Sequence, residues 1–199
     1  MGFFFKFLHI IFLFNWSLNS SRLSNMGLKI FQWNCNGIST KRGDLLKTLA
    51  CHRPDIVILQ ESKLQPSQVN KPENIPLFPG YQIFRKDRTV ADGGGGLLTL
   101  VKLSLNAQEC DSPFDPPASV NDNLEFLFVK VWLTAQQSII VGNLYNPPTN
   151  SLQLTYNPPL PKNLIISGDS MLTIPSGAKA LRMPMARQSI VCFSKQTFT

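Results

Sequence analysis

The chain has 199 residues, a hydrophobic fraction of 43% and a formal net charge of +7. This length fits one domain of ordinary size, and the apolar fraction is high enough to build a core, which excludes a wholly disordered chain. The basic balance favours nucleic acid as a partner before a membrane surface, although the same charge would also keep a small protein soluble. The four cysteines form no CxxC pair and are accompanied by two histidines, so we expect neither a structural zinc site nor a disulfide framework.

An apolar segment, FFFKFLHIIFLF, covers residues 3–14. It is shorter than the roughly 20 apolar residues that a membrane span needs, and it lacks the basic start and the small-residue cleavage site of a signal peptide. We interpret residues 1–26 first as an extension outside the domain, second as a signal peptide and third as an anchor. The cysteine usage favours an intracellular protein, nuclear if it acts on DNA, while this segment leaves secretion open.

From Leu28 onward the pattern is that of an α/β protein. Residues 28–34 predict a strand, and Asp44 is predicted to cap a short helix that Pro54 ends. Residues 56–59 form an uninterrupted apolar run, as expected of a strand that is covered on both faces. Four prolines in residues 65–79 indicate a surface loop.

Alternating or continuous apolar runs predict further strands in the second half of the chain. They cover residues 81–84, 97–101, 124–133, 138–145 and 163–167, with the third and fourth joined as a hairpin through residues 134–137. Five prolines between Tyr145 and Asn163 argue against a helix there. After Asp169 the pattern is lost, and we interpret residues 170–199 as an unrelated or disordered tail.

Polar residues stand where the predicted buried strands end, which is where sheets usually present function. These residues are Asn34, Asn36, Gln60, Glu61, Asn143, Tyr145 and Asp169. Glu61 and Asp169 could share a Mg²⁺ ion, which prefers oxygen ligands and typically uses one or two carboxylates. Each residue alone also has an ordinary explanation: Asp169 as a turn residue, Glu61 as the first solvated residue after a strand, and Tyr145 as a packed aromatic.

Six blocks follow one another from Gln32 to Asp169: QWNCNG, PDIVILQES, GYQIFRKDR, GGGGLLTLVK, VGNLYNPP and LIISGD. In this order they resemble the apurinic/apyrimidinic-endonuclease-like domain of non-LTR retrotransposons of the jockey type, within the endonuclease/exonuclease/phosphatase superfamily. The resemblance implies that residues 27–169 form a truncated domain of that superfamily. Its fold would be a partial four-layered α/β sandwich, two packed mixed sheets flanked by helices, with the C-terminal part missing.

The resemblance further implies a Mg²⁺-dependent phosphodiesterase that nicks DNA and exposes a 3′-hydroxyl for reverse transcription. By position, Glu61 matches the metal-binding glutamate. Asn36, which stands near the position of an acidic residue in the cellular relatives, is the second candidate metal ligand. Asn34, Tyr145 and Asp169 match the catalytic asparagine after the first strand, the tyrosine that contacts the scissile phosphate and the aspartate that orients the attacking water.

Lys86 and Arg88 stand in the basic block of the same resemblance and are candidate DNA-phosphate contacts, with solvated surface charge as the alternative. DNA is therefore the expected partner. Neither a small-molecule cofactor besides Mg²⁺ nor a membrane partner is expected.

The match breaks after Asp169, where Ser170 and Met171 stand in place of a hydrophobic residue and an asparagine. A thioether supplies no N–H donor, and the family's terminal Ser-Asp-His block is absent. The histidines present, His9 and His52, fall at no family site. We therefore expect this copy to lack activity. The alternatives are a non-catalytic nucleic-acid-binding remnant, or a secreted DNase-like or phosphatase-like relative that uses residues 3–14 as a signal.

Overall fold

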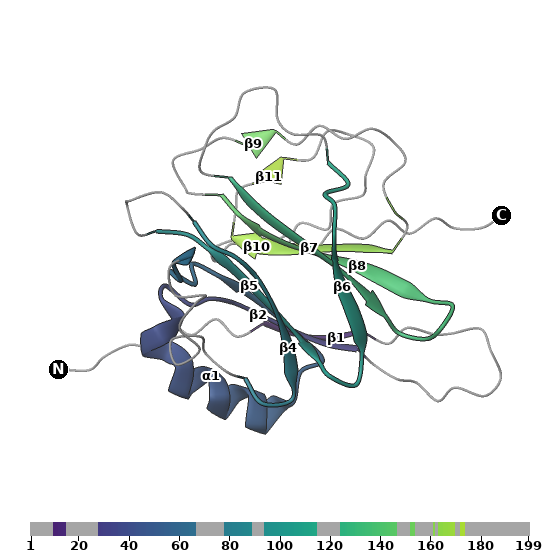
Figure 1. The fold of residues 1–199 in the computed structure, drawn as a ribbon, viewed down its shortest axis with the longest axis horizontal. Helices are drawn as coiled ribbons and strands as arrows, with labels where there is room; N and C mark the ends of the chain where they lie inside the picture. Colours follow the sequence, from purple (N-terminus) through teal and green to yellow (C-terminus); the bar gives the residue numbers. More distant parts are fainter. Residues whose placement is uncertain are drawn as a thin grey trace.

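Two packed β-sheets form the centre of the protein in the computed structural model (Figure 1). The structure describes residues 10–14, 28–66, 78–88, 94–114, 124–146, 152–153, 161, 163–169 and 172–173, with only the backbone described at residues 10–14, 152–153, 169 and 172–173. Within these ranges, no helix is long and apolar enough to cross a membrane.

The first sheet has five strands in the order β1-β2-β3-β5-β4. They are β1 (Ile10–Phe14), β2 (Leu28–Asn34), β3 (Ile56–Gln60), β5 (Leu97–Lys102) and β4 (Tyr81–Lys86). β2 and β3 are parallel, while the other neighbours are antiparallel, so the sheet is mixed. Part of the predicted N-terminal extension thus pairs with β2 as an edge strand. The predicted domain boundary at residue 26 stays a prediction.

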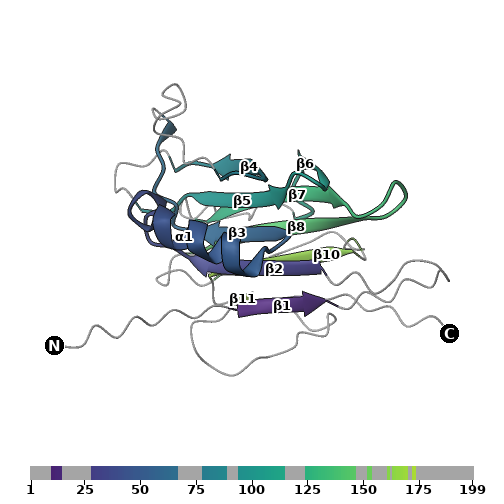
Figure 2. The same cartoon turned by 90° about the horizontal axis from the view of Figure 1, so that it is seen from below.

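The helix α1 (Ile38–His52) connects β2 to β3 and lies along the outer face of the first sheet (Figure 2). The prediction that it begins after Asp44 is wrong. Ile38 is buried together with Leu45 and Leu49 on one face, and this burial extends the helix toward β2. The helix ends, as predicted, before Pro54, with Arg53 in the left-handed conformation at φ 46°.

The second sheet has four strands in the order β10-β8-β7-β6. They are β10 (Leu164–Asp169), β8 (Ser138–Tyr145), β7 (Glu125–Trp132) and β6 (Asn106–Cys110). The predicted hairpin of β7 and β8 is confirmed, and β10 runs parallel to β8. The edge strand β6 was not predicted, since its mostly exposed sequence NAQEC carries no apolar signal. Two short strands, β9 (Leu152–Gln153) and β11 (Leu172–Thr173), pair with each other.

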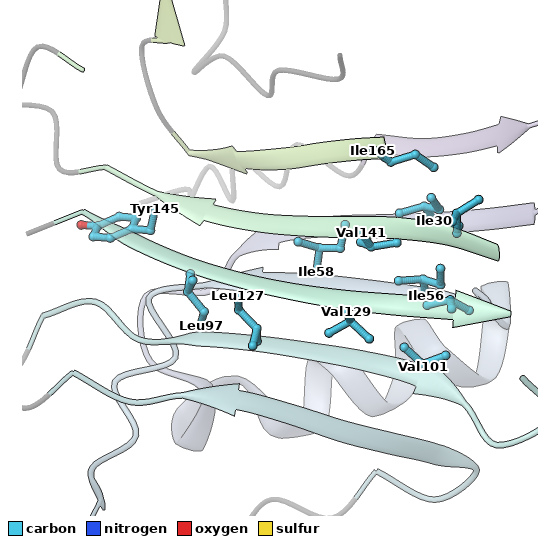
Figure 3. Packing of buried hydrophobic residues seen from close by; sticks show 12 residues of the cluster. Ile30, Ile56, Ile58, Leu97, Val101, Leu127, Val129, Val141, Tyr145 and Ile165 are labelled. Atoms are coloured by element: carbon cyan, nitrogen blue, oxygen red, sulfur yellow. The ribbon is translucent and has the colours of Figure 1, made fainter. Parts of the chain in front are cut away.

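Aliphatic side chains from both sheets fill the space between them, as Figure 3 shows. A second cluster packs α1 against the other face of the first sheet. β3 is therefore buried on both faces, which explains its continuous apolar sequence. The predicted fold class is confirmed in its two packed mixed sheets. Most of the predicted loop at residues 65–79 and of the predicted tail at residues 170–199 lies outside the described residues.

Candidate functional site

The last residues of β2, β3, β8 and β10 meet at one edge of the two sheets. Asn34 is level with Gln60 in the first sheet, and Asp169 is level with Tyr145 in the second. The two sheets are in contact here, since Gln60 Nε2 on the first donates a hydrogen bond to Asn143 Oδ1 on the second at 2.8 Å. We call this region, with Asn34, Glu61, Tyr145 and Asp169, the site edge. All four residues were candidates from the sequence, and the fold brings their strand ends together.

Glu61 and Asn34 are joined directly at the site edge. Asn34 Nδ2 donates to Glu61 Oε1 at 2.8 Å, while Asn34 Oδ1 accepts the Asn36 backbone N–H at 3.2 Å. Glu61 adopts a φ of 52° and Asn36 one of 45°, a region that side-chain-bearing residues seldom occupy. Such conformations persist where neighbours impose them, and they gather at functional sites. Here the Gly37 N–H, bonded to Glu61 O at 2.7 Å, fixes the two turns against each other.

Lys63 reaches the site edge from the turn after β3. Its Nζ donates to Asn36 Oδ1 at 2.5 Å, and both side chains are exposed. Asn36 was predicted to be a metal ligand, but its amide oxygen accepts a hydrogen bond from the Lys63 ammonium. Its role toward a metal stays a prediction. Lys63 was not predicted from the sequence, where its position two residues after Glu61 was the available signal.

The glycine run before β5 lets two backbones approach closely behind Glu61. Ser62 N–H donates to Gly96 O at 2.9 Å, and Lys63 N–H donates to Gly95 O at 3.0 Å. A Cβ atom at Gly96 would stand 2.6 Å from Ser62 Oγ, and its φ of 85° also favours glycine. The run thus supports the turn that carries Glu61.

A buried ion pair lies behind the same glycines. Arg88 Nε stands 3.0 Å from Glu125 Oε1, with side chains only 9% and 8% exposed, and Glu125 Oε2 accepts the Gly96 N–H at 2.6 Å. Arg88 was predicted to contact DNA or to be solvated, yet its side chain is largely withdrawn from solvent. Its contact with DNA stays a prediction, whereas Lys86 is exposed. Glu125 was missed, because no sequence pattern links it to Arg88.

Tyr145 forms the end of the inter-sheet core, with 8% of its surface exposed, and Figure 3 shows its hydroxyl directed away from Ile56 and Val101. The side chain of Asp169, and all of His9, Ser170 and Met171, lie outside what the structure describes. His52 is exposed at the last position of α1, whereas the first turn of that helix adjoins Glu61 and Ser62. His52 therefore lies far from the site edge.

Cys35 is buried beside Glu61 and is no nucleophile. Burial, and after it the Glu61 carboxylate, raises the pKa of its thiol to about 12. Its Sγ donates to Gln60 O at 3.2 Å. The thiol therefore packs the turn between β2 and α1 in its neutral form.

The oxygen donors at the site edge suit a hard divalent cation. Glu61 offers a carboxylate oxygen, Oε2, that takes no part in the Asn34 bond. Magnesium accepts one or two carboxylates and completes its shell with water. In the described ranges, no group of three His, Cys, Asp or Glu residues gathers to hold a metal. The fit therefore rests on Glu61, with Asp169 as the predicted second carboxylate.

Comparison with known proteins gives one family and several distant relatives. The profile of the endonuclease/exonuclease/phosphatase family matches residues 31–161. A DNA-(apurinic or apyrimidinic site) endonuclease 2 from Xenopus laevis is 33% identical over 84 residues, which cover 42% of this chain and 16% of that protein. The chain thus spans a small part of its curated relative.

Two solved structures are similar to this chain at low sequence identity. A humanized D. rerio TDP2 with 14 mutations has a TM-score of 0.51 at 18% identity, covering 85% of this chain and 83% of that chain. The endonuclease domain of TRAS1, a telomere-specific non-LTR retrotransposon, has a TM-score of 0.44 at 18% identity, covering 70% of this chain and 58% of that chain. The similarity to the TDP2 structure supports the fold alone.

Proposed function

Since the chain belongs to the endonuclease/exonuclease/phosphatase family, we propose that it derives from a Mg²⁺-dependent DNA-nicking phosphodiesterase of the non-LTR retrotransposon kind and no longer cuts. The observation that carries the phosphodiesterase proposal is the Glu61–Asn34 pair, held at 2.8 Å where the strand ends of both sheets meet. The retrotransposon origin rests on the order of the six sequence blocks.

In this proposal Glu61 holds the metal, and the Asn34 amide orients its carboxylate. When bound, Mg²⁺ would neutralise charge that develops on a phosphate and would lower the pKa of a bound water. In the same proposal Tyr145, at the end of the second sheet, would donate its hydroxyl hydrogen to a phosphate oxygen. Asp169 is level with it on β10 and is the proposed partner for the attacking water.

The proposed loss of cutting rests on two further groups that catalysis needs beside these residues, a general acid and an electrostatic donor. Acid–base assistance typically contributes about 10²–10⁴-fold in rate, and one electrostatic donor contributes about 10²–10³-fold. Met171, two residues after Asp169, stands where an amide donor is expected. His52 lies at the far end of α1, so it is not placed to act as the general acid.

Nicking of supercoiled plasmid tests both parts of the proposal. The full chain with Mg²⁺ is expected to leave the plasmid supercoiled under conditions in which a nicking enzyme of the same family relaxes it. Plasmid relaxation that disappears in Glu61→Gln would overturn the loss of cutting and keep the phosphodiesterase proposal. Relaxation that Glu61→Gln does not change would contradict the assignment of Glu61.

A non-catalytic DNA-binding role is the second candidate, and the two exposed lysines favour it. Lys63 and Lys86 are both exposed, and both adjoin the Gly95-Gly96 segment behind Glu61. Phosphate contacts by lysine bind without reading sequence and weaken as salt rises. This candidate predicts salt-sensitive binding of duplex DNA that Lys63→Gln and Lys86→Gln weaken and Glu61→Gln does not. Absence of duplex DNA binding at low salt would contradict the DNA-binding candidate.

A further inference from the structure

Four polar side chains form one hydrogen-bonded layer between the two sheets, directly beneath the site edge. They are Gln32, Gln60, Thr99 and Asn143, with exposed fractions between 0% and 6%. Gln32 Nε2 donates to Gln60 Oε1 at 2.6 Å, and Gln60 Nε2 donates to Asn143 Oδ1 at 2.8 Å. The layer interrupts an interface that otherwise consists mainly of aliphatic side chains. We call these four residues the amide layer.

Asn143 is the member of the amide layer that comes from the second sheet, and its amide faces three acceptors on the first. Its Nδ2 lies 3.0 Å from Leu59 O, 3.2 Å from Leu98 O and 3.3 Å from Thr99 Oγ1. With the bond from Gln60 to its Oδ1, the side chain is fixed to both β3 and β5. One side chain of β8 thus hydrogen-bonds the second sheet to two strands of the first.

The position of the Asn143 hydrogen bonds matters because the residues of the site edge come from both sheets. Glu61 directly follows Gln60 on the first sheet, and Tyr145 stands two residues after Asn143 on the second. Aliphatic contacts are non-directional, so they permit small sliding of one sheet over the other, whereas hydrogen bonds restrict distance and angle. A displacement of about 1 Å is enough to impair a site of this kind.

We propose that Gln60 and Asn143 are positioning residues that hold the two halves of the site edge in one register. The inference rests on the proposed function, since its consequence is the placement of Glu61 relative to Tyr145. Both side chains are fully buried, so they act through the residues beside them. Partners behind a metal ligand typically contribute about 10–100-fold to metal affinity.

The decisive variant is Gln60→Met with Asn143→Leu, which keeps volume and removes the directional bonds. Replacing both partners of a buried hydrogen bond by apolar groups can leave stability nearly unchanged. Because the buried Gln32 amide loses its Gln60 acceptor in this variant, we expect a moderately lower unfolding midpoint. With Mn²⁺ as the probe for the metal site, we expect the dissociation constant of the folded variant to rise by about tenfold. Hydrogen exchange should become faster at the Gly37 and Ser62 amides and should not change at the Lys102 amide, which bonds Asp55 O at the other end of the sheet.

The matched control is Val131→Ala, in the same interface but at its aliphatic end. It should lower the unfolding midpoint and leave Mn²⁺ affinity unchanged. Wild-type Mn²⁺ affinity together with wild-type exchange at Gly37 and Ser62 in the double variant would overturn the positioning role. If the double variant does not fold, Gln60→Met alone decides by the same two readouts, because it keeps the Asn143 bonds to Leu59 and Leu98.

The same experiment separates failure of the inference from failure of the proposed function. Mn²⁺ binding that Glu61→Gln leaves unchanged, or no binding by the wild-type chain, would count against the proposed function. The exchange rates at Gly37 and Ser62 would then still decide whether the amide layer fixes the register.

Discussion

The interface between the two sheets has two ends that differ in chemistry. At one end the facing side chains are aliphatic: Ile30, Ile56, Val101, Val131 and Ile139. At the other end lie the amide layer and, above it, Glu61 and Tyr145. The aliphatic end supplies burial, which stabilises without regard to direction. The polar end supplies bonds of fixed geometry, and the candidate site lies there.

This difference between the two ends implies that stability and site geometry can be changed separately within one interface. Changes at the aliphatic end should alter the free energy of unfolding and spare the site. Changes in the amide layer should alter metal binding at the site even where their effect on the free energy of unfolding is moderate. Buried charge beside the site edge is the exception, because it should affect stability most of all.

The buried ion pair of Arg88 and Glu125 gives the largest expected effect on the free energy of unfolding. Arg88→Met removes the partner of the buried Glu125 carboxylate and should lower the free energy of unfolding by about 3–5 kcal/mol, since an uncompensated charge then stays buried. Urea denaturation measures the change. The control is Lys86→Met, an exposed residue on the same strand end, which should cost at most about 0.5 kcal/mol. Equal costs for the two variants would show that the ion pair is not buried in solution.

Ile56→Ala tests the aliphatic end. Ile56 is fully buried, and its truncation should lower the free energy of unfolding by about 2–5 kcal/mol. Mn²⁺ affinity of the folded variant should not change, because Ile56 lies at the opposite end of β3 from Glu61. Ile56→Val should give the same result at about 0.5–1.5 kcal/mol. A loss of Mn²⁺ affinity that parallels the loss of stability would contradict the separation of the two ends.

The smallest effect concerns Cys35, which lies beneath the site edge. Its pKa is raised from 9.0 to about 12 by burial, so the unfolded chain ionises first as pH rises. The neutral thiol's contribution to stability is therefore complete below pH 9 and is lost progressively as the pH rises from 9 to 12. Denaturation at pH 8 and pH 10 should show a smaller decrease in Cys35→Ala than in the wild type. Identical decreases would mean that the thiol titrates normally.

The sequence predicts the buried strands well, because burial on two faces leaves a continuous apolar run, as in β3. It also selects Asn34 and Glu61 as candidate site residues, through the resemblance of the blocks that contain them, but it does not predict the hydrogen bond between them. The start of α1 was missed because the burial of Ile38 depends on tertiary contacts. Gln60 and Asn143 were selected only as strand-end polar residues, since their contact joins segments far apart in the chain. For the same reason Glu125 could not be found.

Mn²⁺ binding to Glu61 tests the central claim most directly, with the ion followed by its paramagnetic resonance in the presence of the full chain. The matched control is Glu109→Gln, which removes the same charge from an exposed position on β6. We predict that Glu61→Gln raises the dissociation constant by at least about tenfold, whereas Glu109→Gln leaves it unchanged. Equal affinities for the wild type and both variants would contradict the account, because the site edge would then hold no metal at Glu61.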